Sequence, residues 1–168
     1  ARTIDRFVCG YAVATVDEGL KLRRHGIEKE ILSLGPVSAG RYQECLENDI
    51  SLPVFEYRRA KELSDAAVAE GKTAKIHIAV DTGMSRIGLF PDEGSVEIVK
   101  EIAELPALRI AGMFTHFARA DEADKTNAGE QYRRFREFCD DVKAAGVAVP
   151  VCHCSNSAGI FDLKQANL

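Results

Sequence analysis

The chain has 168 residues, of which 46% are hydrophobic and 29% are charged, and its formal net charge at pH 7 is −4. This length suffices for one domain with a substantial core, and the composition excludes both a disordered chain and a basic nucleic-acid-binding protein. We therefore expect a small molecule or another protein as the partner, and no nucleic acid.

Short apolar runs alternate with amphipathic helical stretches along the whole chain. The apolar runs, expected as strands, are 8–15, 30–35, 51–56, 75–80, 108–116 and 149–154. The stretches expected as helices between them are 16–26, 41–48, 58–71, 92–105 and 127–146. The strands are continuously apolar, as in strands buried on both faces, so the pattern predicts a parallel sheet covered by helices.

Residues that favour helix ends support these assignments. Thr15 or Asp17 can cap the first helix, and Asn127 can start the long one. Gly26 and Gly146 stand where these two helices are expected to end.

Two architectures fit the alternation, an α/β barrel and an open doubly wound sheet. No GxGxxG motif follows the first strand and no P-loop occurs in the chain, which disfavours the nucleotide-binding open sheet. Six strands do not close an eight-stranded barrel. We therefore predict an α/β fold, an incomplete TIM (β/α)8 barrel, and expect 1–168 to be a fragment of that domain.

The sequence also predicts a cytoplasmic protein with no membrane association. No apolar run approaches the ~20 residues of a membrane helix, and residues 1–19 lack the regions of a secretory signal peptide. An odd number of scattered cysteines indicates reduced thiols without a disulfide framework. These cysteines are Cys9, Cys45, Cys139, Cys152 and Cys154.

Polar residues stand where three of the expected strands end. Arg86 follows the fourth strand, His116 ends the fifth, and His153, Asn156 and Ser157 surround the end of the last. The carboxyl ends of barrel strands form the functional face of such a fold. Three strands therefore direct polar groups to one place.

Arg86 follows a short turn with glycine on both sides. Its guanidinium can donate two parallel hydrogen bonds to a carboxylate, a phosphate or a phenolate. The alternative is a surface arginine paired with Asp92 or Glu93. Asp81, just before the turn, can act as a general base or simply turn the chain.

His116 lies between apolar residues and a charged loop. Its imidazole can serve as an acid or base, a metal ligand or a flat partner for an aromatic cofactor. A hydrogen bond to the backbone is the alternative. Similarly, residues 155–159 (SNSAG) can bind a phosphate or another anion at a helix start, or Ser155, Asn156 or Ser157 can cap that helix.

The run Cys152, His153, Cys154 contains three residue types that bind zinc. Side chains alternate across a strand, so the histidine would point away from both cysteines. No second ligand pair follows at a suitable spacing. We therefore expect no metal.

Three stretches together resemble a known family: 80–89 (VDTGMSRIGL), 112–122 (GMFTHFARADE) and 153–159 (HCSNSAG). In this order and strand context they resemble the barrel domain of the alanine racemases, the pyridoxal 5'-phosphate enzymes that interconvert L- and D-alanine. Residues 10–35 resemble the segment after the family's first strand. The resemblance implies that 1–168 is a partial N-terminal barrel domain with strands two to seven.

The resemblance implies roles for five side chains. Arg86 would hold the phenolic oxygen of the cofactor and the carboxylate of the substrate. His116 would lie against the pyridine ring, and Ser157 would help to hold the phosphate. Asn156 and His153 would support these residues through hydrogen bonds. Arg86 and His116 are thus the catalytic residues expected in this chain, and all five are expected to bind the cofactor.

Several family features have no counterpart here. They are the first-strand lysine that carries the cofactor, the tyrosine base from the C-terminal domain of the partner subunit, and an arginine near the pyridine nitrogen. Ala79 stands where the family commonly has a carbamylated lysine that orients the arginine. The resemblance thus implies a homodimeric alanine racemase that supplies D-alanine for peptidoglycan, of which this chain is an inactive fragment.

Other interpretations stay open. A serine/alanine racemase would act on a different small amino acid, and relatives of that type vary at the position of Ala79. A non-catalytic barrel protein that binds pyridoxal phosphate would carry the cofactor without racemisation. A barrel without any cofactor is the third alternative.

Overall fold

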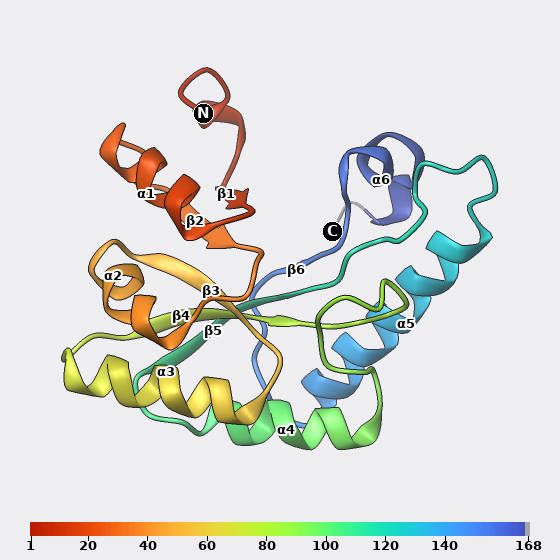
Figure 1. Ribbon diagram of the computed structural model, residues 1–168. Coiled ribbons are helices and arrows are strands. Elements are labelled where there is room, and N and C mark those ends of the chain that lie inside the picture. Colours follow the sequence, from red (N-terminus) through yellow and green to blue (C-terminus); the bar gives the residue numbers. More distant parts are fainter. Residues whose placement is uncertain (167–168) are drawn as a thin grey trace.

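Six parallel strands form one curved sheet in the computed structural model, which describes residues 1–166. The strands are β1 (Gly10–Val13), β2 (Glu30–Ser33), β3 (Ile50–Val54), β4 (Ala74–Ala79), β5 (Leu108–Phe114) and β6 (Cys152–His153). They lie side by side in chain order, and every neighbouring pair is parallel. An open doubly wound sheet would reverse its strand order, so this order confirms the predicted incomplete (β/α)8 barrel (Figure 1).

Helices α1 to α5 connect consecutive strands, and α6 follows the last strand. They are α1 (Val16–Arg24), α2 (Tyr42–Glu47), α3 (Tyr57–Ala69), α4 (Glu93–Ala103), α5 (Thr126–Ala144) and α6 (Ser157–Asp162), with short 3-10 turns at Asp5–Phe7, Ala39–Arg41 and Lys164–Ala166. Neighbouring helices from α2 to α5 pack against one another along the sheet (Figure 1). Within residues 1–166, none of these helices has the length and apolar character needed to cross a membrane.

The main apolar core lies between the sheet and the helices. Ile76 of β4 and Phe135 of α5 are both fully buried in it. Burial of one such side chain contributes about 1.5–3 kcal/mol to stability. Because side chains alternate across a strand, the other face of the sheet carries a second, smaller cluster. Its buried members are Leu32, Ala79 and Phe114.

The helix starts confirm one predicted cap and correct another. Thr15 caps α1, because its hydroxyl accepts from the N–H of Glu18 (3.4 Å) while the Glu18 carboxylate accepts from the N–H of Thr15 (3.2 Å). The prediction that Asn127 starts the long helix is wrong. Asp124 accepts both the N–H (2.9 Å) and the hydroxyl (2.6 Å) of Thr126, so α5 begins at Thr126.

The last strand is shorter than predicted. Of the expected range 149–154, only Cys152–His153 forms β6. It pairs with β5 alone, at Met113 and Phe114, and has no neighbour on its other edge within the described residues. The length of a strand depends on which neighbouring strands it pairs with, and an apolar run in the sequence does not show that pairing.

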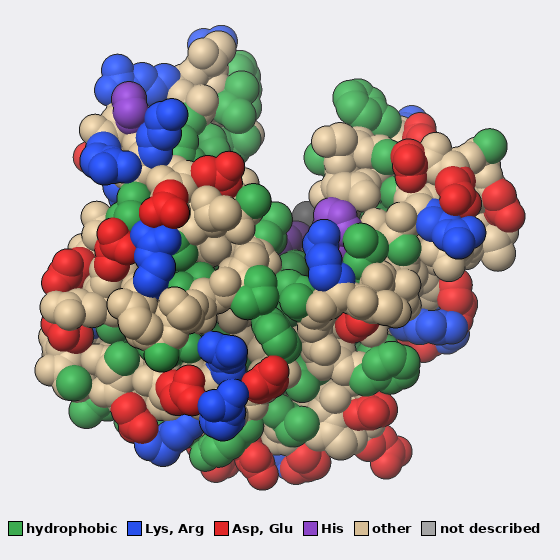
Figure 2. Space-filling model, in the orientation of Figure 1, with side chains coloured by type: hydrophobic (Ala, Val, Ile, Leu, Met, Phe, Trp, Pro, Cys, Tyr) green, Lys and Arg blue, Asp and Glu red, His purple; other side chains and the backbone are tan. Residues whose placement is uncertain are grey.

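One face of the molecule is hollowed. Figure 2 shows this hollow between the part around β1 and β2 and the part around α6, with histidine side chains beside it. It lies on the face of the sheet that helices α2 to α5 do not cover. The polar strand ends described below lie on this side of the fold.

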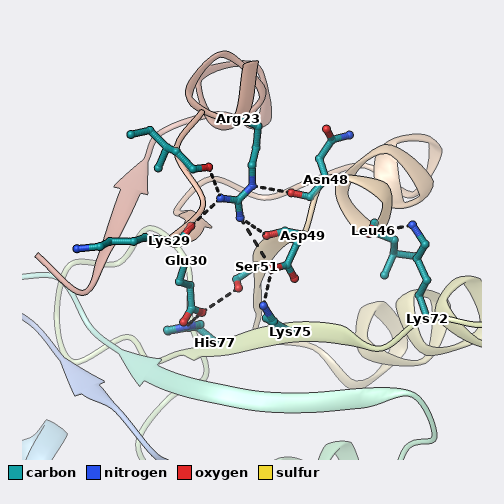
Figure 3. A network of polar contacts seen from close by, with 11 residues as sticks. Arg23, Lys29, Glu30, Leu46, Asn48, Asp49, Ser51, Lys72, Lys75 and His77 are labelled. Atoms are coloured by element: carbon teal, nitrogen blue, oxygen red, sulfur yellow. Dashed lines mark hydrogen bonds and ion pairs between the residues drawn. The ribbon is translucent and has the colours of Figure 1, made fainter. Parts of the chain in front are cut away.

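Arg23, at the end of α1, is the centre of a polar network before the starts of β2 and β3 (Figure 3). Its guanidinium donates to the backbone carbonyls of Asn48 (2.8 Å), Ile27 (2.8 Å), Lys29 (2.6 Å) and Asp49 (2.7 Å). Charge-assisted bonds of this kind are the stronger ones. Arg23 thereby holds together the two loops that lead into neighbouring strands.

Candidate functional site

The loops after β4, β5 and β6 carry the residues predicted to be functional. Arg86 lies in the loop between β4 and α4, and His116 lies in the loop after β5. Asn156 and Ser157 begin α6 directly after β6. Since β4, β5 and β6 are adjacent and parallel, their carboxyl ends meet at one edge of the sheet.

Arg86 is exposed and forms no hydrogen bond or ion pair with any residue in the described part of the chain. The alternative pairing with Asp92 or Glu93 is therefore not found. Asp92 instead caps α4, where its Oδ1 accepts from the N–H of Ser95 (2.8 Å). A free guanidinium at this position is available to bind an anion.

Asp81 shapes the turn that leads to Arg86. Its Oδ1 accepts from the N–H groups of Gly83 (2.9 Å) and Ser85 (3.0 Å). Ser85, directly before Arg86, has a φ of 57°, a left-handed conformation that is uncommon outside glycine. The turn interpretation of Asp81 thus agrees with the structure.

The loop that holds Arg86 closes tightly onto the end of β4. The N–H of Leu89 donates to the carbonyl of Ala79 (2.9 Å), and the N–H of Asp81 donates to the carbonyl of Leu89 (2.8 Å). Gly88 makes this closure possible: its φ is 130°, and a Cβ there would lie 2.4 Å from the nitrogen of Asp81. A side chain at this position would force the loop open.

Ala79 lies in the small apolar cluster on the inner face of the sheet. It is 1% exposed and packs with Leu32 and Phe114. The methyl group of Ala79, in apolar surroundings, therefore occupies the position at which the family commonly has a carbamylated lysine. No side chain among residues 1–166 holds the Arg86 guanidinium, so the conformation of its loop alone sets its position.

His116 is half-buried at the end of β5. Burial lowers its pKa below the ordinary value, and the positive charge of Arg86 lowers that pKa further. The two side chains therefore lie within electrostatic reach of each other. Near neutral pH the imidazole is uncharged, as is suitable for a flat partner of an aromatic ring.

The start of α6 is fixed against the loop that carries His116. Asn156 caps the helix by accepting from the N–H of Gly159 (2.9 Å), and its amide donates to the carbonyl of Phe117 (3.4 Å). A Cβ at Gly159 would lie 3.3 Å from the ring of Phe117, so the two segments pack closely. Ser157, the first residue of α6, is exposed, and its hydroxyl has no hydrogen-bond partner among residues 1–166.

His153 lies in a chain of polar groups that crosses the inner face of the sheet. Its Nε2 is 3.1 Å from Nδ1 of His77, and Nε2 of His77 is 3.1 Å from Oε1 of Glu30. Ser51 also donates to this carboxylate (2.9 Å), as Figure 3 shows. The ring of His153 stacks on that of Phe114, with centroids 5.3 Å apart and an interplanar angle of 12°.

The charges of Glu30, His77 and His153 determine which imidazole nitrogens carry protons. Burial raises the pKa of Glu30, but hydrogen bonds from His77 and Ser51 lower it more, so the carboxyl is ionised. Burial lowers the pKa of His77, and it lowers that of His153 to about 4. His77 then donates to Glu30 through Nε2 and accepts from Nε2 of His153 through Nδ1. Nδ1 of His153 is left as an acceptor.

The cysteines beside His153 point to other places. Cys152 lies near the thiol of Cys139, which lowers the pKa of Cys152 below its ordinary value. Cys154 donates to the carbonyl of Ala166 (3.3 Å). In the part of the chain that the structure describes, no three His, Cys, Asp or Glu side chains are arranged to hold a metal ion.

Comparison with known proteins identifies the family. Residues 1–168 match the family described as "Alanine racemase, N-terminal domain". The chain belongs to this family. The match covers every predicted site residue of the chain.

Several alanine racemases are similar in sequence and structure. The alanine racemase of Clostridium novyi (strain NT) is 46% identical over 162 residues, which are 96% of this chain and 42% of that protein. The solved alanine racemase of Clostridium difficile 630 superposes with a TM-score of 0.95 at 34% identity, over 99% of this chain and 44% of that one. The chain thus spans about two fifths of the length of the relatives it matches.

A racemase with another name has the same fold. The solved histidine racemase of Leuconostoc mesenteroides subsp. sake superposes with a TM-score of 0.84 at 26% identity, over 94% of this chain and 41% of that one. Members of the alanine racemase family and this relative therefore share the strand arrangement described above.

Glu30 and His77 were not predicted from the sequence. Their partners are distant in the chain, with 47 positions between His77 and Glu30 and 76 between His77 and His153. One signal was present: a histidine within the apolar run 75–80 must find a partner once the strand is buried. The sequence does not show which partner that is.

Proposed function

We propose that residues 1–168 form part of the barrel domain of an alanine racemase, which interconverts L- and D-alanine with pyridoxal 5'-phosphate. Residues 167 and 168 lie outside the described part of this domain. The observation that carries the proposal is Arg86, unpaired among residues 1–166, within electrostatic reach of a neutral His116 whose loop contacts the start of α6. The family match and the 46% identity to a named alanine racemase support it.

The residues at the strand ends fit the cofactor. Pyridoxal phosphate offers a phenolic oxygen, a flat ring and a phosphate. Arg86 supplies a cation with free N–H donors, and His116 supplies an uncharged ring. Ser157 and the first amides of α6 form a donor set for the phosphate. Three types of group on the protein thus match three parts of one molecule.

Each side chain then has a defined task. Arg86 holds the phenolic oxygen and orients the substrate carboxylate, and His116 supports the ring. Ser157 binds the phosphate, with Asn156 fixing the helix start and His153 supporting the inner face. When bound, the cofactor draws electrons away from the substrate and acidifies its α-hydrogen. The resemblance assigns the proton transfers to a lysine and a tyrosine without counterparts in 1–168, so we propose that this chain alone is inactive.

The remaining parts of the proposal concern the intact protein. We propose a homodimer in the cytoplasm that takes a small amino acid as substrate and supplies D-alanine for peptidoglycan. A serine/alanine racemase and a non-catalytic cofactor-binding barrel are the alternatives that the assay must separate. Ala79, in its apolar surroundings, bears on the choice between alanine and serine, because it offers Arg86 no anionic partner and no other described residue pairs with that arginine.

The test is a racemisation assay on the full-length protein with pyridoxal phosphate. We expect D-alanine to form from L-alanine, with L-serine and L-histidine converted much more slowly, and no product from 1–168 alone. The variant Arg86→Gln is expected to lower kcat/KM by about 10²–10³-fold, as removal of one donor to a reacting anion does. The matched control is Arg58→Gln, which removes an exposed arginine paired with Glu62 on α3.

Each outcome has a distinct meaning. Cofactor absorbance without racemisation of any amino acid would establish the non-catalytic binder and refute the enzyme. Faster conversion of L-serine than of L-alanine would identify the serine/alanine type. Equal activity in both arginine variants would contradict the role of Arg86.

A further inference from the structure

One buried side chain of α5, Gln131, connects the loops that carry Arg86 and His116. It is 2% exposed. Its Oε1 accepts from the N–H of Ala118 (2.9 Å), and its Nε2 donates to the carbonyl of His116 (3.2 Å) and to the hydroxyl of Thr82 (3.2 Å). Three of its bonds thus reach two loops that follow neighbouring strands.

The geometry allows only one orientation of this amide. The N–H of Ala118 requires an acceptor and the carbonyl of His116 requires a donor, so exchanging oxygen and nitrogen would break both bonds. The hydroxyls of Thr82 and Thr115 share a further hydrogen bond (2.8 Å), and these threonines are 2% and 4% exposed. Among the described residues, every buried side-chain nitrogen and oxygen has a partner.

The contacts of Gln131 lie next to both candidate catalytic residues. Thr82 follows Asp81, whose carboxylate forms the turn that presents Arg86. On the other loop, the amide binds the backbone of His116 itself. A shift of Gln131 would therefore change the separation of the two functional side chains.

We propose that Gln131 is a positioning residue for racemisation, which holds Arg86 and His116 at their working separation without touching substrate or cofactor. This proposal rests on the proposed function. A merely structural role is the alternative, since loss of any buried hydrogen-bonding group lowers stability. A positioning role also predicts changes in kcat/KM and in the pKa of His116, whereas a purely structural role predicts a change in stability alone.

The structure offers a matched control for that difference. Ser64 of α3 is fully buried, and its hydroxyl donates to the carbonyl of Pro106 (2.6 Å), before the start of β5. Ser64→Ala therefore removes a buried side-chain hydrogen bond to the backbone at the opposite end of the strands. A loss of stability alone should affect this variant and a Gln131 variant in the same way.

The experiment compares Gln131→Met with Ser64→Ala in the full-length protein loaded with pyridoxal phosphate. We expect kcat/KM for alanine to fall about 10–100-fold in Gln131→Met, because small misplacements of reacting groups have effects of this size. The value for Ser64→Ala is expected to stay within about 2-fold of the wild type. A Gln131→Met enzyme as active as the control would overturn the proposal.

A second measurement does not depend on activity. The pKa of His116 is followed by NMR in the full-length protein without cofactor. The charge of Arg86 helps to lower this pKa in the wild type, so we expect it to rise in Gln131→Met and to stay unchanged in Ser64→Ala. An unchanged His116 pKa in Gln131→Met would count against the proposal. If the wild type racemises nothing, the proposed function fails, whereas this titration still reports whether Gln131 couples the loops.

A milder variant covers the case in which Gln131→Met does not fold. Thr82→Val keeps the shape of the side chain and removes the hydroxyl that links the loop of Arg86 to Gln131 and to Thr115. We expect a fall in kcat/KM of about 3–10-fold and a rise in the pKa of His116. Wild-type values for both quantities would refute the positioning role.

Discussion

Acidification is expected to destabilise the protein through His153. Burial lowers the pKa of this imidazole from 6.5 to about 4, and the nearby His77 contributes to the shift. In the unfolded chain the ring takes up a proton near its ordinary pKa, whereas in the folded protein it stays neutral until the pH approaches 4. The unfolded state therefore binds more protons within this window, and the stability present above it is lost as the pH falls.

The size of the loss follows from the two pKa values. A folded pKa of about 4 against an unfolded value of 6.5 amounts to about 3.4 kcal/mol once both transitions are complete. Between about pH 7.5 and about pH 5, roughly 2 kcal/mol of this is lost, and solvent screening of a partly buried ring reduces it to about 1–2 kcal/mol. His77 acts in the same direction within this window, because burial lowers its pKa from 6.5. Glu30 adds to the loss only below its unfolded value of 4.5, because its pKa is lowered from that value.

Denaturant unfolding at these two pH values measures the effect. It is done without cofactor, since binding would itself shift the apparent stability. We expect the wild type to lose about 1–2 kcal/mol more than His153→Asn between about pH 7.5 and about pH 5. The control is His25→Asn, at an exposed histidine, which should lose as much as the wild type. Equal losses in His153→Asn and the wild type would refute the reasoning, as would a folded His153 pKa near 6.5 by NMR.

Three further substitutions test the loops. Gly88→Ala is expected to cost about 2–4 kcal/mol, since its Cβ would lie 2.4 Å from the nitrogen of Asp81; an unchanged Tm would contradict this. Arg23→Gln is expected to cost about 2–4 kcal/mol in denaturant unfolding, because it removes three half-buried bonds and one exposed bond to backbone carbonyls. Arg58→Gln, at an exposed i,i+4 pair, is expected to cost less than about 0.5 kcal/mol. Equal costs would show that the Arg23 network adds no stability. Asp81→Ala is expected to lower kcat/KM about 10-fold or more by loosening the turn before Arg86, and wild-type kinetics would exclude that role.

Sequence patterns predicted the inner strands better than the edge strand. The expected ranges 75–80 and 108–116 agree closely with β4 and β5, because an apolar run buried on both faces is a local signal. The range 149–154 shortened to Cys152–His153, since pairing with a single neighbour determines the extent of β6. The start of α5 was missed for a related reason, as the turn at Asp124 replaces a simple N-cap.

The same distinction applies to the candidate site. The gathering of Arg86, His116 and Ser157 at one edge could be predicted, because parallel strands in a barrel end on the same side. The link through Gln131 could not, since its partners lie in two separate loops and no local pattern distinguishes this glutamine from a solvated one. The sequence therefore predicts where the candidate groups lie, and the structure shows what holds them there.

Arg23 and Arg86 lie at opposite ends of the strands and differ in how their guanidinium groups are used. Arg23 donates to four backbone carbonyls, so its hydrogen-bonding capacity is used within the fold. Arg86 has the same chemistry but no hydrogen-bond or ion-pair partner among residues 1–166, and its loop is shaped by Asp81, Gly88 and the contact with Gln131. An arginine whose loop is well defined while its guanidinium stays free adds little to stability. A defined loop with a free guanidinium is what the proposed binding of an anion by Arg86 requires.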